Sequence, residues 1–227
     1  MKLTKGVMTR STMLLSMTVF ALVSVVPAFA DTIAYSDPSG QGTQNWTGNL
    51  ALTFQVNTAI TVDELGVFNT SGTNELNAPG SIIVGIYNSS DALLTSTTFS
   101  AGTAYAVSNS DLLKSISSIL LAPGTYEVDA VGFSSSNNNG NLNAGSSTGP
   151  TLNNDGGALT FLGAAYDSST TLDDPTTCVG CQSGSAGQRQ FDAGTFGFVV
   201  TPEPRGFVLL GTGLLSLGAM ARRRFLA

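Results

Sequence analysis

The sequence predicts an all-β protein: an antiparallel β-sandwich of jelly-roll-like form, with an N-terminal signal helix and a C-terminal transmembrane helix outside the sandwich. Two observations in residues 31–200 predict the sandwich, namely short apolar stretches that alternate with polar residues and turn residues between those stretches. No part of this body shows a capped helical pattern of three turns. About eight short strands with Gly, Pro and Asn between them suit a jelly roll.

Eight stretches carry the strand pattern. In residues 50–56 apolar side chains alternate with Ala, Thr and Gln, and this period of two is typical of a half-buried strand. Turn pairs such as Pro79-Gly80 and Pro123-Gly124 separate later stretches. In chain order, the strands expected are residues 50–56, 60–68, 81–87, 92–99, 113–121, 125–133, 158–166 and 194–200.

Two long stretches of the body, residues 134–157 and 167–190, contain few apolar residues and many Gly, Ser and Asn. Loops of this length are uncommon inside compact domains and often carry function. We therefore expect a binding surface on one of them.

Residues 1–30 have the layout of a secretory signal. Three basic residues within the first ten are followed by an apolar run at 13–26. Ala28 and Ala30 then form an A-x-A site for signal peptidase. Cleavage there would make Asp31 the first residue of an exported protein. An uncleaved N-terminal membrane anchor is the alternative.

The last segment, residues 201–227, has three parts in a fixed order: a stiff polar motif, an uncharged apolar run and a basic cluster. These parts are Pro202, Glu203 and Pro204, the run 206–221, and Arg222, Arg223 and Arg224. Sixteen residues form a helix of about 24 Å, just short of a usual span, and the terminal arginines place that end in the cytoplasm. The run predicts a transmembrane helix.

This order of parts resembles the PEP-CTERM sorting signal of Gram-negative bacteria. The resemblance implies an exported protein that an exosortase-type membrane protease recognises and cleaves, so that a membrane-anchored precursor becomes a cell-surface or extracellular-matrix protein of the biofilm and exopolysaccharide. Arg205 follows the motif directly, where the family more often has a small residue, and three residues extend past the arginines. An ordinary C-terminal anchor is the alternative.

Charge and histidine content exclude several classes of function. Residues 31–201 contain 14 acidic residues and only two basic ones, a formal charge of −12. Nucleic acid is not an expected partner, because phosphate binding needs clustered Lys and Arg. The chain has no histidine, which excludes Ser-His-Asp and Cys-His chemistry. We therefore expect no enzyme activity.

The two cysteines, Cys178 and Cys181, lie in a Gly/Ser-rich loop. In an exported protein they are expected to form a small structural disulfide. A reduced, intermolecular or catalytic pair is the alternative. A zinc site is excluded, because a structural one needs four ligands and the chain has neither His nor a third Cys.

Acidic pairs are the remaining candidates for chemistry. The pair Asp63–Glu64 is expected on opposite faces of its strand, because side chains alternate there. Asp173 and Asp174 lie in a loop, with Asp167 and Asp155 as neighbours that can help to bind calcium. No EF-hand pattern occurs, so no cofactor or metal site is assigned and calcium is left open.

Aromatic residues can stack on sugar rings. Trp46 and Tyr35 lie in polar surroundings and are the sugar-contact candidates. Taken together, the sequence predicts a structural or adhesive protein of an extracellular matrix. A carbohydrate-binding module is the alternative, and an extracellular hydrolase has the least support.

Overall fold

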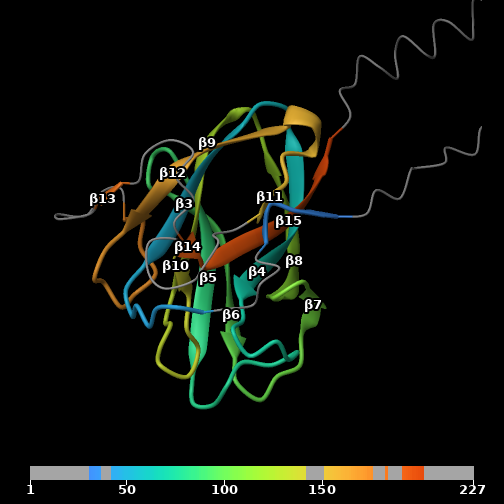
Figure 1. The fold of residues 1–227 in the computed structure, drawn as a ribbon. Helices are drawn as coiled ribbons and strands as arrows, with labels where there is room; N and C mark the ends of the chain where they lie inside the picture. Colours follow the sequence, from blue (N-terminus) through green and yellow to red (C-terminus); the bar gives the residue numbers. More distant parts are fainter. Residues whose placement is uncertain (1–30, 37–41, 142–150, 176–181, 184–190, 202–227) are drawn as a thin grey trace, which may run out of the picture.

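The computed structural model describes residues 31–36, 42–141, 151–175, 182–183 and 191–201 of the chain. These residues form two main antiparallel β-sheets that enclose one apolar core, an all-β sandwich as the sequence predicted (Figure 1). No helix in these ranges has the length and apolar character needed to cross a membrane. The predicted signal segment, 1–30, and the predicted transmembrane run, 206–221, lie outside them.

The larger sheet has six strands. Their order across the sheet is β13 (Gln182–Ser183), β12 (Leu159–Tyr166), β3 (Leu50–Val56), β9 (Gly124–Val131), β5 (Ser81–Asn88) and β6 (Leu93–Ser100). Strands β3 and β9 at its centre are paired along the full length of β3. The central position of β9 decides the geometry of the site described below.

The smaller sheet has five strands. Their order is β1 (Thr32–Ile33), β15 (Gly194–Val200), β4 (Ile60–Phe68), β8 (Asp111–Leu121) and β7 (Ala106–Ser108). Short elements complete the fold: the pairs β10 (Gly140–Asn141) with β14 (Phe191–Asp192) and β11 (Thr151–Leu152) with β2 (Tyr35–Ser36), and a 3₁₀ turn at Asp155–Gly157. The first and last described strands, β1 and β15, are direct neighbours.

All eight strands that the alternation predicted are present, and their ends agree to within two residues. The two- and three-residue strands were not predicted. A strand this short has too few residues to show alternation, and its position depends on the partner that it pairs with.

The core lies between the sheets and is built from the inward residues of each strand. Phe54 on β3 and Phe196 on β15 are both 0% exposed, and their ring centroids are 4.7 Å apart. Phe196 also contacts Phe198 at 5.8 Å and Tyr35 at 6.4 Å. Because Phe196 contacts aromatic rings from both sheets, we expect it to be a major source of the packing energy between them.

Strand β4 contains a bulge at Asp63. Its pairing register shifts there against both β8 and β15. Val62 and Leu65 both lie in the core, so the two residues between them, Asp63 and Glu64, share the outer face. The prediction that these carboxyls face opposite sides is therefore wrong, because a bulge adds one residue to the alternation. Burial and the nearby Asp31 carboxylate raise the pKa of both.

We expect Phe196→Ala to lower the free energy of unfolding by about 3–5 kcal/mol, because it removes a fully buried ring and leaves a cavity. The control is Leu120→Ala, whose side chain is 65% exposed and whose loss should change stability by about 0.5 kcal/mol or less. Urea denaturation of both variants measures this. Equal effects would contradict the central place of Phe196 in the core.

Candidate functional site

The candidate site lies on the outer face of the six-stranded sheet, where strand β9 presents two acidic residues. Val128 and Ala130 on β9 belong to the core. Side chains alternate along a strand, so Glu127 and Asp129 take the opposite face. Both are nevertheless buried, with exposed fractions of 3% and 0%. The outer face is therefore covered at this point.

The neighbouring strands surround the two acids differently. Glu127 is paired with Thr53 on β3 and with Tyr87 on β5, so it has a polar partner on each side. The Thr53 hydroxyl donates a hydrogen bond of 2.7 Å to Glu127 Oε2. Asp129 is paired instead with Ala51 and Gly85, which have little or no side chain. This leaves space above Asp129 for another segment of the chain.

The segment that fills this space is residues 167–175. Its Leu172 comes so close to the backbone of Gly85 that a Cβ at that position would lie 2.8 Å from Leu172 Cδ2. Gly48 likewise allows a close approach at the start of the segment, since a Cβ at that position would clash with the carbonyl oxygen of Asp167. The segment brings two further buried carboxylates, Asp167 and Asp174, to the acidic face of β9.

Asn49 holds this segment in place. Its amide nitrogen Nδ2 donates to Asp167 Oδ1 at 3.1 Å and to the Thr171 carbonyl at 2.9 Å. Its side-chain oxygen accepts a hydrogen bond from the backbone N–H of Asp173 at 3.3 Å. One buried amide thus satisfies polar groups along most of a segment that has no regular secondary structure.

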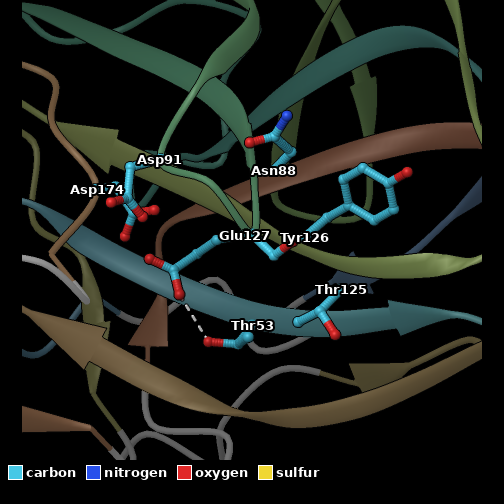
Figure 2. Close-up of a pocket in the computed structure, with 8 residues that line it drawn as sticks. Thr53, Asn88, Asp91, Thr125, Tyr126, Glu127 and Asp174 are labelled. Atoms are coloured by element: carbon cyan, nitrogen blue, oxygen red, sulfur yellow. Dashed lines mark hydrogen bonds between the residues drawn. The ribbon is translucent and has the colours of Figure 1, made fainter.

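A pocket of about 210 Å³ opens beside Glu127. It is lined from the sheet by Thr53 and Thr125, and from the loops by Asp91 in the β5–β6 turn and by Asp174. Figure 2 shows the Glu127 side chain extending from β9 toward Asp174 and Asp91. Besides burial, the nearby Asp174 carboxyl raises the pKa of both Glu127 and Asp91, so it lies close to each of them. Three carboxyl groups therefore follow one another along the pocket.

Burial and mutual repulsion favour the protonated forms of these acids. Burial raises the pKa of Glu127 to about 8, against the lowering effect of the Thr53 hydrogen bond and with a further increase from Asp174. Burial and the charge of Glu127 raise the pKa of Asp129 well above its usual value. Burial and the Asp129 charge likewise raise the pKa of Tyr87 to about 12. A protonated carboxyl can act as a general acid, whereas ionised carboxylates can bind a cation.

The structure brings together some of the acids that the sequence proposed for calcium and separates one. Asp167 and Asp174 lie over β9, and the backbone N–H of Asp173 donates a hydrogen bond to the Asn49 side chain. Asp155 is in the 3₁₀ turn before β12, whereas Asp167 follows the other end of that strand. Eight residues of strand, roughly 25 Å, separate them. The inclusion of Asp155 was therefore wrong.

The two aromatic residues proposed for sugar contact both pack against other residues of the domain. Tyr35 is 3% exposed and packs on Phe161 with a centroid distance of 4.8 Å, so the prediction of a sugar contact there is wrong. Trp46 is half-buried, and its indole N–H donates to the Asp167 carbonyl at 2.8 Å. Its ring packs edge-on against Tyr166. Trp46 thus supports the segment 167–175.

The remaining site residues named from the sequence lie outside the described residues. They are Ala28 and Ala30 of the cleavage site, Cys178 and Cys181 of the disulfide, Pro202, Glu203 and Pro204 of the motif, and Arg222, Arg223 and Arg224 of the basic cluster. Their roles stay predictions.

Sequence reasoning missed Glu127, Asp129 and Asn49. The signal for the two acids was present, since the alternation in 125–133 places them together on the face opposite Val128. Such a face is normally exposed to solvent. Its burial depends on the path of the segment 167–175, which no local pattern reveals.

Comparison with protein-family models, with curated proteins and with solved structures finds no significant match for this chain. The site is therefore interpreted from its own geometry.

We expect Asn49→Ala to lower the free energy of unfolding by about 1–3 kcal/mol, because it leaves buried groups of the segment 167–175 without partners. Asn57→Ala is the matched control, since Asn57 is exposed and bonds to the Gly157 carbonyl and to Thr160. Hydrogen exchange should show faster exchange within 167–175 in Asn49→Ala only. Unchanged exchange there would show that Asn49 does not hold the segment.

In EDTA, stability should fall as the pH rises from about 4.5 to about 8, because the folded state keeps the Glu127 proton that the unfolded state loses above its ordinary pKa of 4.5. Asp129 and Tyr87 on the sheet, Asp91 in the turn, and Asp167 and Asp174 in the segment are the titratable groups around it. The stabilising contribution of the Glu127 proton is complete below pH 4.5 and is lost as the pH rises through about 8. The free energy of unfolding falls by at most about 1.4 kcal/mol per pH unit for each proton. Glu127→Gln should reduce the slope. A free energy of unfolding that does not change with pH would contradict the raised pKa of Glu127.

Proposed function

We propose that this chain is an exported β-sandwich protein with a structural or adhesive role at the cell surface or in the extracellular matrix of a biofilm. The terminal segments carry the proposal, since a signal-like segment precedes the sandwich and a segment resembling the PEP-CTERM signal follows it. The proposed partners are signal peptidase and an exosortase-type membrane protease, and exopolysaccharide in the matrix. The membrane is a partner only before processing.

The arrangement of the first and last strands supports this proposal. Strand β1 begins at Thr32, just after the predicted cleavage site, and β15 ends at Val200, just before the Pro-Glu-Pro motif. Thr32 pairs with Phe198, and Ile33 pairs with Gly197. Removal of both terminal segments would leave every described strand intact, as a processed protein requires.

The surface composition gives a second argument for an extracellular role. The described strands present Ser, Thr and Asn between few charges, and the residues 31–201 have a formal charge of −12. A net charge far from zero keeps an exported protein soluble without basic patches that bind nucleic acid. The same proposal includes three finer features, namely a jelly-roll form of the sandwich, an N-terminal signal helix and a C-terminal transmembrane helix.

The two aromatic residues that the sequence proposed for a carbohydrate-binding module make their contacts within the fold. Tyr35 is buried, and Trp46 packs against Tyr166 with its indole N–H donated to a backbone carbonyl. The pocket beside Glu127 includes one aromatic residue, Tyr126, whose ring stacks on Phe54 at a centroid distance of 6.0 Å and whose hydroxyl donates to the Ala122 carbonyl at 2.9 Å. We therefore put the matrix role first.

The proposal predicts a processed species that begins at Asp31 and ends near Pro204 when the chain is expressed in a bacterium with an exosortase-type protease. Intact mass spectrometry of the membrane, medium and washed matrix fractions measures both ends and the location together. Most of the processed species should be found in the matrix fraction.

The test variant replaces both Pro202 and Pro204 by Ala, and Pro123→Ala in the β8–β9 turn is the control. The double variant should accumulate in the membrane at full C-terminal length, whereas the control should be processed normally. A wild-type chain that keeps residues 205–227 in the membrane fraction would refute the processing. A processed chain found only in the medium would refute the matrix role.

A further inference from the structure

Three carboxylates on the covered face of β9 have oxygens with no hydrogen-bond partner among the described residues. Both oxygens of Asp129, Oε1 of Glu127 and Oδ2 of Asp167 are buried and accept no hydrogen bond from any residue that the structure describes. Only the other oxygens of Glu127 and Asp167 are satisfied, by Thr53 and by Asn49 and Ser169 respectively. A buried acceptor without a donor is costly, and a buried carboxylate more so.

No described positive charge is available to compensate these groups. Lys114 is the single basic residue in the ranges that the structure describes, and it belongs to β8 of the other sheet. Its ammonium donates to the Thr98 carbonyl at 2.9 Å. Besides burial, the charges of Glu127, Asp167 and Asp174 all raise the pKa of Asp129, so each of the three lies close enough to repel the Asp129 carboxylate.

We propose that Glu127, Asp129 and Asp167 bind a calcium ion between β9 and the segment 167–175. Calcium takes six to eight oxygen ligands in a flexible geometry, and carboxylates, hydroxyls and backbone carbonyls all serve. The acidic face offers these oxygen groups, and the part of the chain that the structure describes contains no His or Cys. Magnesium fits less well, because it demands a near-ideal octahedron and keeps its waters.

The pocket beside Glu127 provides the access route. Asp91 and Asp174 line it together with Thr53, so an ion that enters passes carboxyl groups before it reaches the buried oxygens (Figure 2). Among the described residues, no three acidic side chains already converge on one point as they are placed. Binding therefore requires Glu127 to rotate about its side-chain bonds and the segment 167–175 to move inward. Calcium should accordingly order that segment.

The experiment is a calcium titration of the full chain, purified in mild detergent and stripped with EDTA, at pH 7.5 as a chosen condition near neutrality. At a tenfold excess of CaCl₂ over the dissociation constant, the melting temperature should rise by about 3–6 °C. We expect a dissociation constant of about 0.1–1 mM, the range of extracellular calcium modules. MgCl₂ at the same concentration should give a clearly smaller shift.

Asp129→Asn is the decisive variant, because it removes one charge with almost no change in shape. It should abolish the calcium shift, as should Glu127→Gln. Asp155→Asn is the matched control, since Asp155 is an exposed acid in the 3₁₀ turn at the far end of β12. It should respond like the wild type.

A second readout does not depend on the stability of the variants. Terbium chloride replaces calcium in oxygen sites and emits when a nearby tyrosine is excited, and Tyr87 is close enough for the acidic cluster to raise its pKa. Terbium emission should appear with the wild type, fall on addition of CaCl₂ and decrease in Tyr87→Phe.

Three results would overturn the proposal. The first is no calcium shift in the wild type together with a higher melting temperature of Asp129→Asn in EDTA, which would show that protons alone neutralise the cluster. The second is a calcium shift that persists in both Asp129→Asn and Glu127→Gln, which would place the ion elsewhere. The third is an equal shift with MgCl₂, which would indicate general charge screening.

Discussion

The structure depends on the fact that both faces of the central strand β9 are covered while only one of them is apolar. Val128 and Ala130 pack between the sheets, as alternation demands. On the other face, Glu127 and Asp129 lie beneath the segment 167–175. An antiparallel strand normally keeps such a face in water. Here the chain instead closes over two acids, which is costly unless something compensates their charge.

The closing segment is held in part by hydrogen bonds to side chains next to β3. Asn49 and Trp46, both just before β3, bond to its backbone or to Asp167. Leu172 adds an aliphatic contact to the sheet at Gly85. Contacts of this kind are weaker than core packing and are made or broken together. The segment is thus a part of the molecule whose position can respond to what lies beneath it, while the sandwich stays fixed.

Local patterns in the sequence were sufficient for the eight long strands, because each needs only its own alternation and a turn on either side. They failed where a distant partner decides the outcome. The bulge at Asp63 moves that side chain beside Glu64, and its cause is the pairing of β4 with β8 and β15. The acids of β9 were visible as a pair, but their burial follows from residues 167–175, some forty positions later. Tyr35 was misjudged because polar neighbours in sequence do not describe neighbours in space.

The pairing of β15 with β4 also determines how the sandwich would bear mechanical load. Seven residues of β15 pair with β4, from Gly194 with Val67 to Val200 with Ile60. A pull on the chain that leaves the sheet after Val200 acts along the strand axis. It therefore loads the hydrogen bonds between β15 and β4 simultaneously, in shear. A pull that separates Thr32 from Val200 instead detaches the two-residue strand β1 from β15 one residue pair at a time. A sandwich tethered through its C-terminal end would therefore resist traction far better than one stretched between its two ends.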